Sequence, residues 1–375
     1  MKTIWFGLTI GLLVLFIAAC MSANTVKSES LISISALHPG IIYQGRVATE
    51  EEFPRLIWTG ASMTFQVHAD SIWVDLESFN LRGDSLSRPD TLYLSVVVDG
   101  VRTFTLAVPP GHNTLQLPLK SKDSLTRVSL FKNTEANTGA IQIKGLLISP
   151  EGKMGPPPDL LSHRIEFIGN SITCGYGNLG DNQYCRFSNQ TEDGFLSYAR
   201  LTAQHLSAEF QAVCYSGKGI YLNYDRSRNE NLLELYQLYA PGGKPYNFEG
   251  PSPDAVFVNL GTNDFSPSTP SREGFVGQYL NLIRKIKAQH PNAHIFCLTG
   301  PMLNNQAPRK PLDTLKEYIE EVVGQALSEG LGPIDTFNLT PQGPLGFGCD
   351  WHPNLAQHEL NADELSEFAR RKLKW

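Results

Sequence analysis

The stretch Ile165-Glu166-Phe167-Ile168-Gly169-Asn170-Ser171-Ile172-Thr173 joins a short apolar run to a glycine and then to a serine. A short apolar run that ends at a glycine is typical of a buried strand in a parallel sheet. We expect the serine that follows to lie on a tight turn, with its hydroxyl above the sheet edge. Because serine is also a common helix N-cap, Ser171 alone is as well explained by capping as by nucleophilic attack.

The chain continues downstream of this stretch as an alternation of strands and helices. Strands are predicted at 164–168, 211–215, 255–259 and 294–298, and helices at 195–206, 273–290 and 312–327. Such alternation predicts a mostly parallel sheet with helices on both faces over residues 161–375. The active site of such a sheet lies beyond the carboxyl ends of its strands.

Residues 31–150 contain strand patterns and no helical period of comparable length. Alternating or β-rich runs occupy 62–68, 71–76, 92–98, 101–107, 126–131 and 141–148. Asp99-Gly100 lies between two of these runs and is a strong hairpin signal. We therefore predict an all-β jelly roll or sandwich. Residues 151–160, with Pro156-Pro157-Pro158, are predicted to be a stiff linker to the second domain.

The N-terminus predicts export. Lys2 precedes the apolar run from Ile4 to Ala19, which is short of the roughly 20 residues that span a bilayer. Ile17-Ala18-Ala19-Cys20 resembles a bacterial lipobox, which implies a signal peptide over 1–19, lipidation at Cys20 and a tether over 20–30. We expect a cell-envelope protein, periplasmic or surface-facing on the outer membrane. A plain signal peptide or a short signal anchor is the alternative.

Composition and net charge narrow the classes of partner that the protein could bind. The 375 residues are 41% hydrophobic and 18% charged with a net charge of −6, which fits a soluble two-domain protein without a nucleic-acid surface. Membrane contact is expected only through the lipid anchor.

Beyond Cys20 the chain has five cysteines, so at least one stays unpaired within it, and a Cys174–Cys185 bridge is conceivable. No His/Cys cluster has zinc spacing, so no metal is expected.

Three further segments carry residues of chemical interest. Gly217, in Tyr215-Ser216-Gly217-Lys218-Gly219, allows close backbone approach to an oxyanion, although most Ser-Gly pairs are turns. Asn263, in Gly261-Thr262-Asn263-Asp264, offers an amide donor, and Asp264 could cap the next helix. His352 follows Cys349-Asp350-Trp351, and histidine is the usual base for a serine.

Together these residues resemble the four blocks of SGNH/GDSL hydrolases, in which Ser, Gly, Asn and His occur in this chain order. The phrases Gly-Asn-Ser-Ile-Thr-Cys-Gly-Tyr-Gly-Asn, Gly-Thr-Asn-Asp and Asp-Trp-His-Pro-Asn are similar to those of carbohydrate esterase family two, which also has an N-terminal jelly roll. The resemblance implies Ser171 as nucleophile and His352 as base. It places the oxyanion hole at the Ser171 N–H, the Gly217 N–H and the Asn263 side chain, and it implies no cofactor.

The sequence departs from the superfamily at two positions. Asn170 replaces the aspartate of Gly-Asp-Ser, which does not shuttle the proton. The triad acid, three residues before the histidine, is here Cys349. The family resemblance implies that a backbone carbonyl, that of Trp351, orients the imidazole instead. Orientation by the Asp350 carboxylate is the alternative.

The resemblance implies a serine esterase that removes O-acetyl groups from acetylated xylan or glucomannan. Trp351 and Tyr176 are candidate sugar-binding aromatics, with Tyr184 and Tyr221 nearby, although core packing explains most of them as well. An esterase on peptidoglycan O-acetyl groups or lipid esters is one alternative. A non-catalytic glycan-binding lipoprotein is another.

Overall fold

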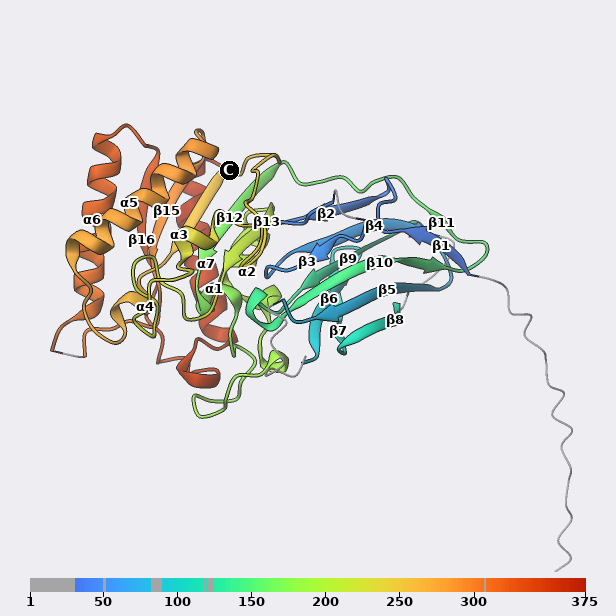
Figure 1. Cartoon of the computed structure of the whole chain (residues 1–375), viewed down its shortest axis with the longest axis horizontal. Coiled ribbons are helices and arrows are strands. Elements are labelled where there is room, and N and C mark those ends of the chain that lie inside the picture. Colours follow the sequence, from blue (N-terminus) through green and yellow to red (C-terminus); the bar gives the residue numbers. More distant parts are fainter. Residues whose placement is uncertain (1–30, 50–51, 82–89, 118, 120–123, 307) are drawn as a thin grey trace, which may run out of the picture.

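The computed structural model describes residues 31–375 except 50–51, 82–89, 118, 120–123 and 307. The predicted signal peptide, the tether and Cys20 therefore lie outside the described residues. Two domains lie side by side along the long axis of the molecule (Figure 1), a β-rich domain and an α/β domain. No helix in the described ranges is both long and apolar enough to cross a bilayer.

The N-terminal domain is a sandwich of two antiparallel sheets. One sheet has the order β1-β10-β5-β8 with β3 paired to β10, and the other has the order β11-β4-β9-β6-β7 with β2 paired to β4. Alternate side chains of both sheets meet in one apolar core, as the period of a strand requires. The strands are β1 (Ile32–Ser35), β2 (Ile41–Gln44), β3 (Arg55–Leu56), β4 (Ser62–His68), β5 (Ile72–Phe79), β6 (Leu92–Val98), β7 (Val101–Val108), β8 (Gly111–Leu117), β9 (Thr126–Lys132), β10 (Ala140–Ile148) and β11 (Lys153–Met154).

Local signals explain the boundaries of this domain. Asp99 and Gly100 form the two-residue turn between β6 and β7, and both have the positive φ that a type I′ turn requires. The sheet extends farther than predicted, because β11 pairs with β4 within the segment assigned to the linker. Pairing ends after Gly155, whose N–H donates to the Gln66 carbonyl, since the three prolines that follow have no N–H.

The second domain is built on a parallel sheet with the order β13-β12-β14-β15-β16. The chain runs from β12 to the edge strand β13 and then returns to the other side of β12 at β14, so the order reverses next to β12. The strands are β12 (His163–Gly169), β13 (Ala208–Cys214), β14 (Ala255–Asn259), β15 (His294–Thr299) and β16 (Ile334–Asn338). Crevices at such reversals, outside the carboxyl ends of the strands, are where ligands bind in open α/β sheets.

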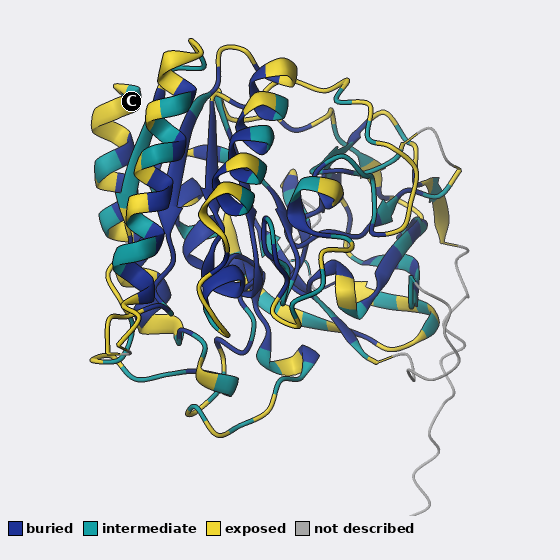
Figure 2. Cartoon of the chain, turned by 60° about the vertical axis from the view of Figure 1, so that its left-hand side comes forward, coloured by how far each residue is buried: buried dark blue, intermediate teal, exposed yellow. Residues whose placement is uncertain are grey.

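Helices cover both faces of this sheet (Figure 2). One apolar cluster joins it to α5 and α6, and another joins it to α2 and α7. The helices are α1 (Ser171–Cys174), α2 (Tyr198–His205), α3 (Leu232–Leu235), α4 (Thr262–Phe265), α5 (Arg272–Gln289), α6 (Pro311–Ser328) and α7 (Leu355–Leu373), with short 3-10 helices at Ala136–Thr138, Asn189–Thr191, Gly194–Leu196 and Cys349–Trp351. Helix α7 was not predicted from the sequence, because its buried face carries Gln357, His358 and Asn361 among the apolar residues.

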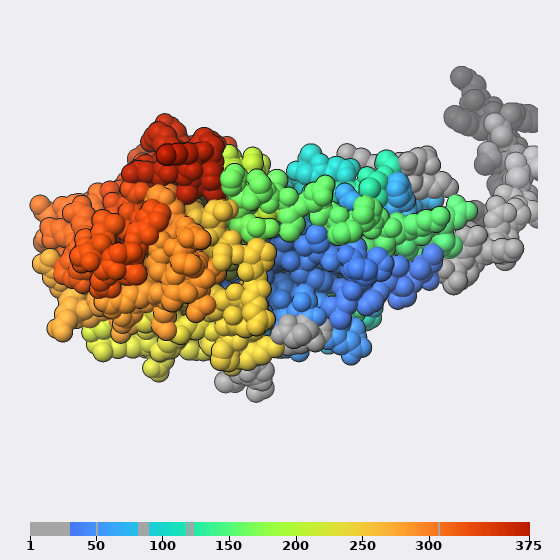
Figure 3. All heavy atoms as spheres, turned by 90° about the horizontal axis from the view of Figure 1, so that it is seen from above, coloured from blue at the N-terminus to red at the C-terminus, as the bar shows by residue number. Residues whose placement is uncertain are grey.

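The two domains meet along a continuous surface (Figure 3) that contains buried polar contacts. The guanidinium of Arg46, in the sandwich, lies 3.2 Å from the Glu166 carboxylate on β12 and also donates to the Tyr236 carbonyl. Trp58 Nε1 donates to the Tyr239 carbonyl at 2.8 Å. Buried charges that lose a partner are strongly destabilising, so these contacts favour one relative placement of the domains.

Two disulfides link segments that are distant in sequence. Cys174 bonds Cys214, and Cys185 bonds Cys349, while Cys297 is a buried free thiol. The conceivable Cys174–Cys185 bridge is therefore wrong. The physical reason is the parallel register, in which Gly169 at the end of β12 pairs with Cys214, so the short α1 carries Cys174 to the end of β13.

Candidate active site

The turn after β12 places Ser171 at the start of a helix. A Cβ atom at Gly169 would lie 2.0 Å from Thr173 Oγ1, so only glycine fits at the end of the strand. Asn170 is the N-cap of α1, and its side chain accepts a hydrogen bond from Ile172 N at 3.1 Å. Because Asn170 caps the helix, the capping role considered for Ser171 belongs to its neighbour, and the Ser171 hydroxyl remains available.

His352 lies against this hydroxyl. Its Nε2 is 2.9 Å from Ser171 Oγ, and its Nδ1 is 3.1 Å from the backbone oxygen of Asp350. A carbonyl only accepts hydrogen bonds, so Nδ1 carries the proton and Nε2 is the lone-pair nitrogen that faces the serine. The tautomer that a general base needs is therefore set by the main chain.

The orienting carbonyl is one residue earlier than the family resemblance implied. The Trp351 oxygen accepts a hydrogen bond from Gln342 Nε2 at 2.7 Å instead of facing His352. The reason is local backbone conformation. Asp350 and Trp351 both have left-handed φ values, +50° and +62°, and this double turn directs the Asp350 carbonyl to the imidazole.

The Asp350 carboxylate binds other groups. It accepts hydrogen bonds from Tyr176 Oη at 3.1 Å, from the Arg186 guanidinium at 3.0 Å and from Phe187 N at 2.9 Å. No hydrogen bond among the described residues joins this carboxylate to the imidazole of His352. Asp350 thus contributes to the site through its main-chain oxygen, and its side chain holds the 186–187 segment.

Tyr176 packs on the histidine. The ring centroids of Tyr176 and His352 are 4.1 Å apart, and Phe187 stacks on Tyr176 with a centroid separation of 4.2 Å. This stack fixes the plane of the imidazole. Tyr176 was predicted to bind sugar, and the structure gives it this contact with the imidazole.

Burial sets the protonation state of the imidazole. Desolvation lowers the pKa of His352 to about 4, although the nearby Asp350 and Cys349 main-chain groups and the Asp350 charge act in the opposite direction. A lowered pKa keeps the ring neutral at lower pH than a solvated histidine. The base is therefore unprotonated through the neutral and mildly acidic range.

Two further donors follow β13 and β14, the strands that flank β12. Gly217 follows β13 with φ of +76°, and a Cβ there would meet no atom within 4 Å, so open space lies on that side of its Cα. Asn263, in α4 after β14, donates one N–H of its side chain to the Lys218 carbonyl at 2.8 Å, which leaves its second N–H for another acceptor. The structure thus brings the predicted Ser171, Gly217, Asn263 and His352 to one edge of the sheet.

Asp264 has a role that sequence analysis missed. It is fully buried in α4 instead of capping the next helix, and its carboxylate accepts hydrogen bonds from the N–H groups of Ile220, Tyr221 and Leu222 at 2.8–3.1 Å. These bonds hold the loop that carries Gly217. Burial raises the pKa of Asp264 to about 6 in spite of the three donors. The only signal in the sequence is its place beside Asn263.

Aromatic side chains lie exposed around His352. Trp351 is 51% exposed and Tyr184 is 76% exposed, and their rings meet edge to face at 6.0 Å. Phe347 also contacts Trp351. Tyr221 contacts Arg228 and Ser271 instead. No group of three or more His, Cys, Asp or Glu within the described ranges could hold a metal ion.

A serine hydroxyl paired with a neutral, half-buried imidazole, at a sheet edge that also carries backbone and amide donors, defines a serine hydrolase of the acyl-transfer class. The chain matches the model of the GDSL-like lipase/acylhydrolase family over residues 167–360 and that of the carbohydrate esterase 2 N-terminal domain over residues 43–158. It belongs to carbohydrate esterase family two and is a carboxylic ester hydrolase.

Similar proteins agree with this assignment. The chain is 33% identical over 341 residues to cellulase/esterase CelE of Acetivibrio thermocellus, an alignment that covers 90% of the chain and 40% of that longer relative. It is 27% identical over 370 residues to an acetylxylan esterase/glucomannan deacetylase of Cellvibrio japonicus, covering 96% of both. A solved family two carbohydrate esterase from Clostridium thermocellum, in complex with cellohexaose, superposes with a TM-score of 0.82 at 32% identity, covering 90% of this chain and all of that one.

The Asp350 carboxylate is expected to be dispensable for proton transfer. Asp350→Asn keeps a residue type that tolerates left-handed φ and keeps the main-chain carbonyl, so we expect kcat within about ten-fold of wild type, whereas loss of a triad acid costs about 10⁴-fold. The measurement is kcat for hydrolysis of 4-nitrophenyl acetate, with His352→Ala as the inactive reference. A loss of about 10³-fold or more in a folded Asp350→Asn protein would make the carboxylate the orienting acid.

The low pKa of His352 predicts an acidic limit of activity far below that of a solvated histidine. Because the neutral imidazole is the base, kcat/KM should hold as pH falls from about 7 and decline only near pH 4. The profile is measured with 4-nitrophenyl acetate between about pH 3.5 and 8. Circular dichroism at each pH separates titration from unfolding. A midpoint of about 6.5 in folded protein would contradict the lowered pKa of His352.

Proposed function

We propose that this protein removes O-acetyl groups from plant cell-wall polysaccharide, acetylated xylan or glucomannan, through an acetyl-serine intermediate. The observation that carries the proposal is the 2.9 Å contact between Ser171 Oγ and the unprotonated Nε2 of His352, with donors for an oxyanion beside it. The Cellvibrio japonicus acetylxylan esterase/glucomannan deacetylase, which aligns along nearly the whole chain, supports the choice of substrate.

The chemistry proceeds as two acyl transfers. His352 takes the proton of Ser171 Oγ as this oxygen attacks the acetyl carbon, and the carbonyl oxygen becomes an oxyanion. In the proposed site, the N–H groups of Ser171 and Gly217 and the side-chain amide of Asn263 stabilise that charge. One such donor is worth about 2.7–4 kcal/mol of barrier. The sugar hydroxyl leaves with the proton from His352, and water then attacks the acetyl-enzyme by the same route.

The exposed rings around the base fit a saccharide better than a long acyl chain. Trp351 and Tyr184 form an open aromatic rim next to His352, and aromatic faces pack against the apolar faces of sugar rings. The Clostridium thermocellum esterase was solved in complex with cellohexaose, so that relative binds an oligosaccharide. In this chain we propose Trp351 as the main sugar contact, with Tyr176 fixing the imidazole beneath it.

The direct test is acetate release from acetylated xylan and acetylated glucomannan. We expect wild type to release acetate and Ser171→Ala, which lacks the nucleophile, to lose at least about 10³-fold in rate while still folded. The matched control is Ser328→Ala, which removes an exposed serine at the end of α6 and should be indistinguishable from wild type.

The possible results separate the candidate functions. Hydrolysis of 4-nitrophenyl acetate without release from either polysaccharide would retain the esterase and reject the substrate. Acetate release that persists in Ser171→Ala would reject the nucleophile. A lack of activity on all three substrates, with retained binding to xylan or glucomannan, would replace the esterase by a glycan-binding function.

We also propose that Cys20 carries a lipid that anchors the mature protein to the cell envelope. The support is the sequence Ile17-Ala18-Ala19-Cys20 after an apolar run. Expressed in a bacterium that processes lipoproteins, the wild type should partition into the detergent phase of a Triton X-114 extract, and Cys20→Ser into the aqueous phase. Equal partitioning of both proteins would reject the anchor without affecting the proposed activity.

A further inference from the structure

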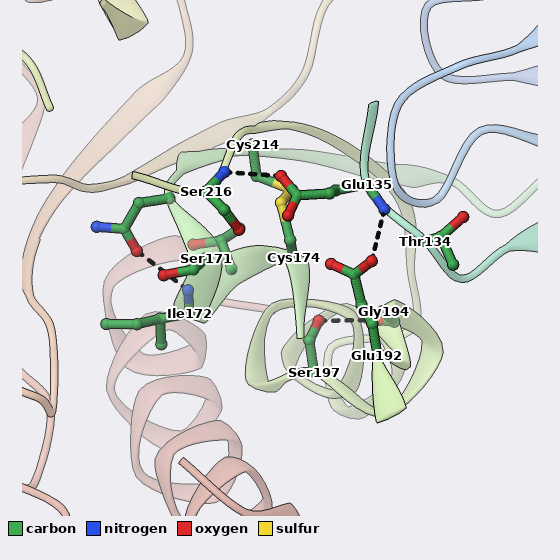
Figure 4. Close-up of a disulfide and its surroundings, with 12 residues drawn as sticks. Thr134, Glu135, Ser171, Ile172, Cys174, Glu192, Gly194, Ser197, Cys214 and Ser216 are labelled. Atoms are coloured by element: carbon green, nitrogen blue, oxygen red, sulfur yellow. Dashed lines mark hydrogen bonds between the residues drawn. A yellow bond between two sulfur atoms is a disulfide. The ribbon is translucent and has the colours of Figure 1, made fainter. Parts of the chain in front are cut away.

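A loop of the β-sandwich reaches the segment that precedes Gly217. The loop follows β9, and in it Glu135 is fully buried, with Oε2 accepting a hydrogen bond from Ser216 N at 2.7 Å. Asn137, two residues later, accepts a hydrogen bond from Tyr215 Oη at 2.8 Å. Figure 4 shows the Glu135 carboxylate directed at Ser216 from the side of the sandwich. The first domain therefore contacts the oxyanion-hole segment of the second.

The contact falls within the turn that presents Gly217. Lys218 N donates to the Tyr215 carbonyl at 3.3 Å, and Gly217 has φ of +76°, the pattern of a β-turn whose third residue must be left-handed. Ser216 and Gly217 are its two central residues. The Glu135 acceptor fixes the peptide that enters the turn, and the Lys218 N–H bond to Tyr215 fixes the peptide that leaves it. The central peptide, which carries the Gly217 N–H, is therefore held between two fixed neighbours.

The same segment is tied to the nucleophile. The Cys174–Cys214 disulfide joins the last residue of α1 to the last residue of β13 (Figure 4), and Tyr215 N donates to the Gly169 carbonyl at 3.2 Å. One side of the turn is thus bonded to the helix that begins with Ser171. Glu135 supplies the other side, and it comes from a different domain.

Glu135 is itself held by a buried polar cluster. Glu192 Oε2 accepts a hydrogen bond from Glu135 N at 3.0 Å, and Lys132 Nζ donates to the carbonyls of Thr134 at 2.6 Å and Glu135 at 3.1 Å. Burial raises the pKa of both carboxyl groups and lowers the pKa of Lys132 to about 7, while the charge of Lys132 opposes the shifts of the carboxyl groups and the two carboxylates oppose the shift of Lys132.

This cluster is costly as a purely structural element. Oε1 of Glu135 and Oε1 of Glu192 are buried without a hydrogen-bond partner among the described residues. Buried polar atoms left unpaired destabilise a fold, and an apolar side chain would fill the same space at less cost. The Glu135 carboxylate also interacts electrostatically with the buried Lys132, but its hydrogen bond to a backbone group is the one with Ser216 N–H, which an apolar side chain could not replace.

We propose that Glu135 of the β-sandwich is a positioning residue for the oxyanion hole: its carboxyl oxygen holds Ser216 N–H and thereby directs the Gly217 N–H at the carbonyl oxygen of the ester. It acts through Ser216 and does not touch substrate. The inference rests on the proposed esterase activity. It makes the sandwich part of the machinery that stabilises the transition state, in addition to any role in glycan binding.

The test uses the whole protein and compares variants that differ in one acceptor. Glu135→Gln keeps an oxygen of the same reach, while Glu135→Met has similar length without an acceptor, and Glu135→Ala removes the acceptor without adding bulk. Gln44→Ala is the control, because it removes a polar contact between the domains, to Glu209, at the opposite end of β13. The readouts are kcat and KM for 4-nitrophenyl acetate and the melting temperature.

We expect Glu135→Met and Glu135→Ala to lower kcat by about 10- to 100-fold with KM within about three-fold, since a misplaced oxyanion donor affects the transition state more than the bound ester. Glu135→Gln should restore kcat to within about three-fold of wild type, and Gln44→Ala should leave kcat unchanged.

Three results would overturn the proposal. The first is wild-type kcat in folded Glu135→Met or Glu135→Ala, and the second is an equal loss of kcat in Gln44→Ala. The third is that Glu135→Met and Glu135→Ala fail to fold while Glu135→Gln is folded and inactive. A wild type that does not hydrolyse the aryl acetate would instead reject the esterase function itself.

Discussion

The hydrogen bond between the Asp350 carbonyl and His352 Nδ1 is the contact on which the site depends. It fixes the proton on Nδ1, so that Nε2 presents its lone pair to Ser171 at 2.9 Å. A neutral carbonyl orients the ring as a carboxylate would, but it stabilises the imidazolium less. Such a dyad relies more heavily on the donors that stabilise the oxyanion, and these donors are held by a dense set of buried contacts.

One disulfide and one ring contact support this hydrogen bond. The Cys185–Cys349 disulfide holds the residue before the left-handed turn at Asp350 and Trp351, and the Tyr176 ring lies on the imidazole. The cysteine thus occupies the position at which other members of the superfamily carry the triad acid. At that position Cys349 contributes to the geometry of the turn and supplies no charge. Desolvation keeps the His352 imidazole neutral.

Contacts between the two domains also help to fix the oxyanion donors. The Arg46–Glu166 ion pair on β12 and the buried Glu135–Ser216 contact both cross the domain boundary, one toward the core of the sheet and one at its active edge. A sandwich attached only by a proline linker would move relative to the sheet. Buried polar contacts at two separate places remove that freedom, because each loses its partner if the domains separate.

Periodicity and turn chemistry determined much of this protein from sequence alone. Apolar runs ending in glycine predicted β12 and β14, Asp99-Gly100 predicted the β6–β7 turn, and the order Ser171, Gly217, Asn263, His352 indicated the family and the residues that meet at one edge. These are local signals, which depend on a residue and its near neighbours. Only the tertiary structure decided the disulfide pairs, the carbonyl that orients His352, the buried loop anchor Asp264 and the contact from Glu135. Each of these depends on which segments the sheet order and the domain interface bring together, or on a left-handed backbone turn. Neither the meeting of distant segments nor such a turn produces a periodic pattern in the sequence.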